Sequence, residues 1–122
     1  MLAAATYQPF TLLARTASED SADLDNTAGN KYAHISIYVS AVASTPSVVF
    51  TIQGKDAAGN YYTLLVSPAI TATGVTILKI GPGMSPSANA VTNDFLPRVF
   101  RVSAVAGDSD SMTYAVSVYT AP

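Results

Sequence analysis

Cysteine and tryptophan are absent from this sequence of 122 residues. Without cysteine the chain has no disulfide framework, no thiolate nucleophile and no thiolate metal site, which fits folding in a reducing cytoplasm. Charge is scarce as well, because charged residues make up 11% of the chain, against about 25% in ordinary domains. The six basic residues are scattered singly, which argues against nucleic acid as a partner. No apolar run approaches the roughly eighteen residues of a membrane span.

Hydrophobic residues, in contrast, make up 49% of the chain, and the formal net charge is only −2. A surface of this composition has little charge repulsion to keep molecules apart. The length suits one domain with a single core. We therefore expect other protein chains to cover part of the surface.

Apolar and polar residues alternate along several short stretches. In the range 33–43, for example, Ile35 and Ile37 fall on one side, whereas Ser36 and Tyr38 fall on the other. A period of two indicates a half-buried β-strand. Seven such strands are predicted, at 10–14, 33–43, 48–55, 61–66, 75–80, 99–106 and 112–120. The predicted fold class is all-β, an antiparallel β-sandwich of about seven or eight strands.

The connections are predicted from their turn residues. Residues 55–60 contain the Asp, Gly and Asn of a short hairpin, and residues 107–110 are interpreted as a second hairpin turn. The strand at 33–43 is expected to pair with the strand that follows it. Residues 84–94 have no sustained period, which indicates a long surface connection with at most a short turn of helix.

The chain divides at residue 30 on composition. Residues 1–30 are interpreted as an N-terminal strand or arm followed by a polar acidic loop, and residues 31–122 as a single β-sandwich domain. Because the arm lacks a clear period, we expect it to become ordered on a neighbouring chain.

Acidic residues cluster in that loop, where four of them lie between Glu19 and Asp25. Carboxylate oxygens this close together are possible calcium ligands, but their spacing is not that of an EF-hand. A solvated acidic loop is the favoured interpretation, and metal binding by the loop stays open. Asp108 and Asp110 are open to two interpretations, a paired acid and base or a turn, of which the turn is favoured.

Exposed aromatic residues are the candidates for binding. Tyr38 and Tyr119 fall on the polar faces of their strands, and the adjacent Tyr61 and Tyr62 cannot both point inward. The single histidine, His34, also lies on a polar face and has no second ligand for a metal motif. These five residues are predicted to form an interface with protein, and sugar stacking on the four tyrosines is the alternative. No catalytic residue, metal site or cofactor is predicted.

Six segments together resemble small virion proteins of tailed bacteriophages. The resemblance covers about three quarters of the chain, from Asp25 to its end, and rests on strand and turn sequences in a fixed order. The segments are DNTAG at 25–29, HISIYV at 34–39, TPSVVFTIQGKD at 45–56, YYTLL at 61–65, ITATG at 70–74 and LPRVFRV at 96–102.

This resemblance implies a β-sandwich that is made in the host cytoplasm and carried on the virion, as a decoration or cement protein on the head. The implied partners are the major capsid protein and further copies of the chain, with trimers favoured by the local symmetry of capsid lattices. A tail or neck component and a carbohydrate-binding module are the alternatives. The resemblance carries no catalytic residues, so an enzyme is not expected.

Overall fold

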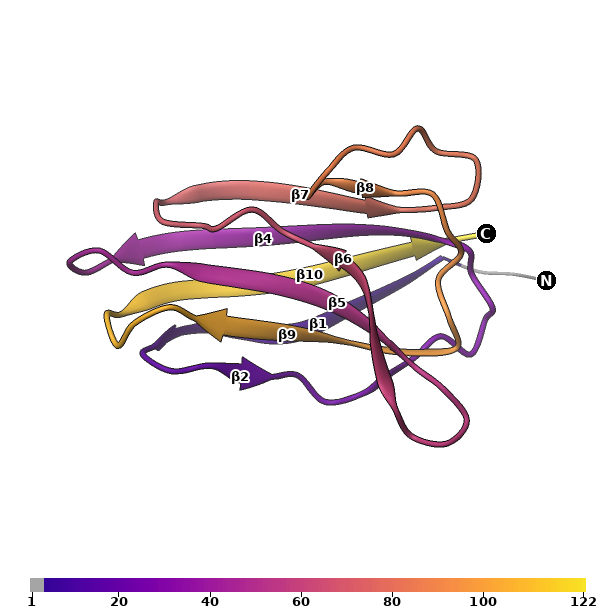
Figure 1. Ribbon diagram of the computed structural model, residues 1–122, viewed down its shortest axis with the longest axis horizontal. Helices are drawn as coiled ribbons and strands as arrows, with labels where there is room; N and C mark the ends of the chain where they lie inside the picture. The colour runs from indigo at the N-terminus through magenta and orange to yellow at the C-terminus, as the bar shows by residue number, and fades with distance from the viewer. Residues whose placement is uncertain (1–3) are drawn as a thin grey trace.

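A computed structural model describes residues 4–122, and within this range the chain forms ten β-strands and no helix (Figure 1). No helix in that range is available to cross a membrane. The strands are β1 (Ala5–Arg15), β2 (Glu19–Asp20), β3 (Leu24–Asp25), β4 (Tyr32–Val42), β5 (Val48–Lys55), β6 (Tyr61–Val66), β7 (Gly74–Ile80), β8 (Val91–Thr92), β9 (Val99–Ala106) and β10 (Met112–Ala121). The seven longer strands correspond to the seven predicted from alternation.

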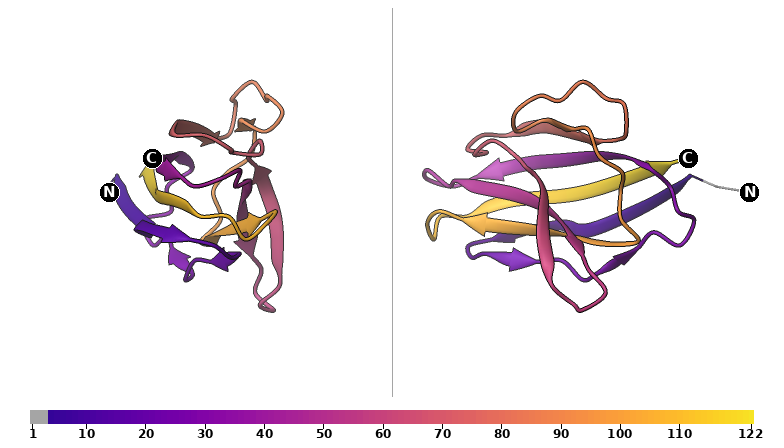
Figure 2. Two further views of the ribbon diagram at one scale, coloured as in Figure 1. Left: turned by 90° about the vertical axis from the view of Figure 1, so that its left-hand side faces the viewer. Right: turned by 45° about the vertical axis from the view of Figure 1, so that its right-hand side comes forward.

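The strands form two sheets that pack face to face (Figure 2). Sheet A has the order β1-β10-β4-β7-β8, and sheet B has the order β2-β9-β5-β6, with β3 also pairing with β9. All pairs are antiparallel except β7 with β8. The predicted all-β sandwich is confirmed.

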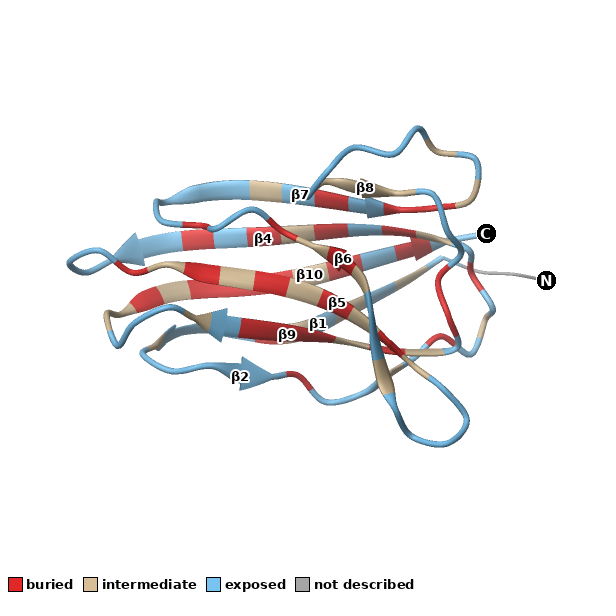
Figure 3. Cartoon of the chain, in the orientation of Figure 1, coloured by how far each residue is buried: buried red, intermediate tan, exposed pale blue. Residues whose placement is uncertain are grey.

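Alternation along the strands produces the core. On β4, Ile35 and Ile37 are buried, and on β5 the buried positions Phe50 and Ile52 face them from the other sheet. Figure 3 shows the resulting stripes, in which buried residues alternate with exposed or intermediate ones on β4 and with intermediate ones on β5. Each sheet therefore presents one apolar face to the core and one face to solvent.

Two predicted pairings are wrong. β4 does not pair with β5, and β9 does not form a hairpin with β10, because the two members of each pair lie in different sheets. The two crossover connections instead meet each other, where the Thr45 backbone N–H donates to Asp110 Oδ2 at 3.1 Å. Alternation identifies the buried face of a strand, but it does not identify the neighbouring strand.

The hairpin between β5 and β6 is confirmed. Asp56 Oδ1 accepts hydrogen bonds from the backbone N–H groups of Ala58 and Asn60, both at 2.9 Å, and Gly59 has a φ of 92°. The hydrogen bonds around the Asn60 end of the turn lower the pKa of Asp56 below its ordinary value. Asp56, Gly59 and Asn60 thus form the tight turn that the sequence predicted.

The N-terminal segment folds onto its own chain, apart from residues 1–3, which lie outside the described residues. β1 begins at Ala5, five residues before the predicted start, and pairs with β10 along its length. β2 and β3, from the acidic loop, both pair with β9. The expectation that a neighbouring chain orders this segment is therefore wrong for residues 5–25. The predicted connection at 84–94 contains β8 and no helix.

An aromatic cluster closes one part of the core. The Tyr114 ring makes edge contacts with Phe50 and Phe10, at centroid distances of 5.0 and 5.7 Å. The guanidinium of Arg15 lies 4.6 Å from the centre of the Tyr114 ring and donates from Nη1 to the Tyr114 carbonyl at 3.0 Å. The Tyr114 hydroxyl is buried without a hydrogen-bond partner among the described residues. Burying this hydroxyl without a partner lowers the free energy of unfolding, and the packing of the ring must offset that loss.

We predict that Tyr114→Phe leaves the free energy of unfolding unchanged or raises it by about 1 kcal/mol, since it removes an unsatisfied hydroxyl. Burial raises the pKa of Tyr114 from 10.0 to about 12. The unfolded chain therefore ionises first, and wild-type stability should fall as the pH rises between these two values. This fall should be smaller in Tyr114→Phe. Thermal unfolding as a function of pH measures both effects, with Tyr62→Phe, at an exposed position, as the control. A clear loss of stability at neutral pH would contradict the prediction.

Candidate functional site

The outer face of sheet A consists of three rows of directly opposed residues on β7, β4 and β10. Side chains on a strand alternate between faces, so the residues between the buried positions of β4 all point outward. The rows are Val75–Tyr38–Ala115, Ile77–Ser36–Ser117 and Lys79–His34–Tyr119. These nine residues define the outer face of sheet A below.

This outer face exposes large apolar side chains. Val75 is 60% exposed, Tyr119 47%, Tyr38 45% and Ile77 37%. Lys79 is the only charged residue among the nine. An exposed surface of this kind is typical of a contact with another molecule, because apolar side chains gain free energy when they leave water.

One end of the outer face is hollowed. His34 and Tyr119 lie side by side there, with ring centroids 6.2 Å apart. The hollow has a volume of about 550 Å³ and is lined by Ala4, Tyr32, Ala33, His34, Lys79, Met84, Tyr119, Thr120 and Ala121. Gly81 allows the Tyr32 ring to lie close to the chain, since a Cβ at this position would overlap that ring. The result is a shallow apolar depression with one cation among its lining residues.

The described ion pairs lie outside this face, around the acidic loop. The four acids of the N-terminal loop pair with four separate cations: Glu19 with Arg15 at 3.1 Å, Asp20 with Arg101 at 3.5 Å, Asp23 with Lys55 at 2.8 Å and Asp25 with Arg98 at 2.9 Å. Within residues 4–122, no three acidic or histidine side chains lie close enough together to hold a metal ion. These ion pairs thus attach the acidic loop to the strands around it.

Tyr61 belongs to this ion-pair network. Its hydroxyl donates to Asp23 Oδ1 at 2.6 Å, and the Arg101 guanidinium lies 3.5 Å from the centre of its ring. Hydrogen bonds from Lys55 and Tyr61 lower the pKa of Asp23, and the bond to Asp23 raises the pKa of Lys55. Tyr61 is therefore committed to contacts within its own chain.

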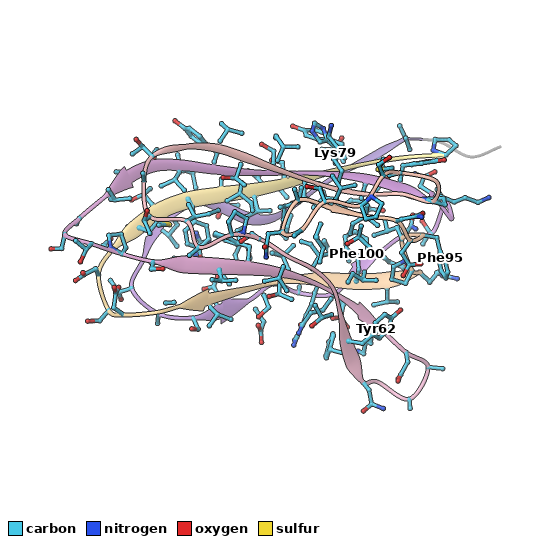
Figure 4. The ribbon with its side chains drawn as sticks, turned by 45° about the horizontal axis from the view of Figure 1, so that its top comes forward. Tyr62, Lys79, Phe95 and Phe100 are labelled. Carbon is cyan, nitrogen blue, oxygen red and sulfur yellow. The ribbon has the colours of Figure 1, made fainter. Side chains whose placement is uncertain are left out.

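Tyr62 lies on β6 of the projecting β5–β6 hairpin, on the opposite side of the molecule from Lys79 (Figure 4). It is 44% exposed. A Cβ at Gly54 would lie 2.6 Å from the Tyr62 hydroxyl oxygen and 2.9 Å from Pro97, so a larger residue there would displace the ring that covers this position. This contact protects the glycine in β5 from water.

The five predicted interface residues therefore divide into two groups. His34, Tyr38 and Tyr119 come together on the outer face of sheet A, whereas Tyr61 and Tyr62 lie on β6 of sheet B. Val75 and Ile77 lie on the same face but were not among the predicted residues. Alternation with the buried residues Leu78 and Ile80 was the signal that could have found them.

Asp108 and Asp110 lie in the crossover from β9 to β10. Asp108 Oδ1 accepts from the Asp110 backbone N–H at 3.0 Å, and Asp110 accepts from Thr45. Both carboxylates thus order the crossover loops, which agrees with the turn interpretation of these residues.

Comparison with known proteins gives a match in fold but none in sequence. No family model and no curated protein sequence matches the chain. Among solved structures, the crystal structure of the SPBc2 prophage-derived protein YomS is similar, with a TM-score of 0.58. The match covers 97% of this chain and 92% of that one, at 10% sequence identity. This likeness shows the fold.

We predict that Asp23→Asn makes stability less sensitive to acid. Because the folded state lowers the pKa of Asp23, its carboxylate stabilises the protein above the ordinary value of 3.8, and this contribution is lost as the pH falls through the lowered pKa. The variant should be less stable than wild type at neutral pH, and its free energy of unfolding should fall less on acidification. Urea unfolding at a series of pH values measures this. Lys55→Gln should reduce the acid sensitivity in the same direction, and an unchanged pH dependence in both variants would contradict the assignment.

Proposed function

We propose that this chain is a non-enzymatic structural protein of a bacteriophage virion, which attaches to other virion proteins through the outer face of sheet A. The observation that carries the proposal is the exposure of Val75, Ile77, Tyr38 and Tyr119 on a face with a single charge. The described ion pairs, in contrast, involve none of the nine residues that define the outer face of sheet A. The outer face of sheet A therefore combines exposed apolar side chains with an absence of ion pairs.

Burial of apolar area drives association through this face. Its free energy is about 25 cal/mol for each Å² removed from water. Contacts between neutral groups are little affected by salt, because screening acts on charges. A protein that must stay attached under varied ionic conditions benefits from such contacts, above all when symmetry repeats them many times.

The finer proposal is a decoration or cement protein on the head surface, with the major capsid protein as its partner. Two findings support a phage origin: the resemblance of six segments to small virion proteins, and a shared fold with a prophage-derived protein of similar extent. A position in the tail or neck is the alternative within the same class. Both positions need the same adhesive face.

We predict that Tyr38→Glu prevents attachment. Purified protein is mixed with particles of the encoding phage that lack it, and the particles are sedimented at low and high salt. Wild type should bind under both conditions, and the variant should bind at least about tenfold more weakly, since it buries a carboxylate in an apolar contact. Thr63→Glu, at an exposed position on β6, is the matched control and should bind as wild type.

Electron microscopy of the decorated particles then locates the protein on the head, the tail or the neck. Density on the head supports the decoration role, and density elsewhere replaces it with the tail or neck role. Failure of the wild type to bind any particle would overturn the virion proposal itself.

Carbohydrate binding is a second candidate function, favoured by the hollow beside His34 and Tyr119. A tyrosine ring at the edge of an apolar depression offers a stacking surface for a sugar, and Lys79 offers a donor. We predict that any glycan bound by wild type on an array is lost with Tyr119→Ala and retained with Tyr62→Ala. An array without binding, or binding unaffected by Tyr119→Ala, would remove this candidate.

A further inference from the structure

The edge of sheet A at β7 is open over most of its length. β8 pairs with β7 only at Lys79 and Ile80, and no other strand of the described residues lies on that side. Figure 1 shows β8 beside the final part of β7 alone. The Lys79 N–H points to this side, because it donates to the Ala90 carbonyl at 2.8 Å. Backbone groups of alternate residues point the same way along a strand, so those of Val75 and Ile77 face the open edge.

The two edges of sheet A are built differently. The edge strand β1 contains Pro9 and two register shifts against β10, which are features that prevent edge-to-edge association. β7 pairs with β4 without a register shift, and residues 74–78 contain neither proline nor charge. An open, regular and uncharged edge with exposed β-branched residues is the kind that pairs with a further strand.

We propose that two copies of this chain pair through residues 74–78 of β7, antiparallel about a two-fold axis at Thr76. In this register, Val75 lies opposite Ile77 of the partner subunit. The edge-facing backbone N–H and C=O groups of each residue then form hydrogen bonds with those of the residue opposite. About four backbone hydrogen bonds form, two for each such pair. The side chains of Val75 and Ile77 become cross-strand neighbours on the outer face, where both are now exposed.

The chain also leaves room for this pairing. Gly74, with a φ of 134°, marks the point where the chain enters β7 from residues 67–73. Those residues run to sheet B, where Ile70 forms a bridge with Val48. In each copy, residues 67–73 therefore lead away from the shared edge and do not overlap β8 of the other copy. Lys79 would lie opposite Thr73 of the partner subunit, so the register brings no like charges together.

The expected dimer is weak. A pairing of five residues a side buries less than the roughly 1,200 Å² of a stable specific interface, so dissociation should be rapid and association should depend on concentration. A two-fold pairing gives dimers, whereas the lattice argument favoured trimers. The inference goes beyond the proposed function and does not rest on it, because the pairing needs no virion protein.

Sedimentation velocity over a concentration series tests the pairing on the intact chain. Wild type should shift towards twice the mass of one chain as concentration rises. Val75→Lys and Ile77→Glu should each weaken association by about tenfold. The double variant should restore it, because the register places the new lysine opposite the new glutamate of the other copy. Leu12→Lys, an equal charge change at an exposed position on β1, should associate as wild type.

A cysteine cross-link tests the register independently. Thr76→Cys provides the only thiol of the chain, and opposed residues of a non-hydrogen-bonded antiparallel pair have Cα atoms about 4.5 Å apart, within disulfide range. Oxidation at high concentration should give a covalent dimer for Thr76→Cys and not for Leu12→Cys. A wild type that stays monomeric at all concentrations, an association unaffected by the β7 substitutions, or the absence of the cross-link would overturn the proposal.

Discussion

The packing of two apolar sheet faces against each other is the interaction on which the rest of this structure depends. Phe50 and Ile52 from sheet B meet Ile35 and Ile37 from sheet A in one core. Because side chains alternate along a strand, burying these residues also decides which residues face outward. Tyr38 faces solvent for the same reason that Ile37 does not. The outer face of sheet A is thus a direct consequence of the register that forms the core.

A second constraint determines where the charged residues lie. The acidic loop must be attached to the sandwich, and four ion pairs with residues of β1, β5, β9 and the segment before β9 contribute to this. Surface ion pairs are individually worth little, but those at β2 and β3 accompany backbone pairing with β9. Four of the six basic residues are used in this way. The sandwich is therefore charged where the chain is tied together and nearly neutral on the outer face of sheet A.

The sequence was sufficient to predict what depends on neighbouring residues. Alternation located the strands and their buried faces, and Asp56 with Gly59 identified the one hairpin whose geometry is local. It was not sufficient for contacts between distant residues. Nothing near Asp23 in the sequence indicates Lys55 or Tyr61 as its partners, and β4 could not be assigned to a different sheet from β5 because both strands alternate in the same way. The candidate face was predicted in part, through His34, Tyr38 and Tyr119.

The similarity in fold to the YomS structure at 10% identity has the same physical origin. A sandwich needs apolar residues at alternate positions and turns at suitable intervals, and many sequences meet these conditions. The core therefore says little about what a sandwich does, whereas its solvent-facing residues are free to differ. In this chain, the solvent-facing residues include the exposed Val75 and Ile77, which lie beside the open edge of β7. Exposed apolar side chains and unpaired backbone groups both favour association with further chains, and their coincidence on β7 is the physical basis of the proposed pairing.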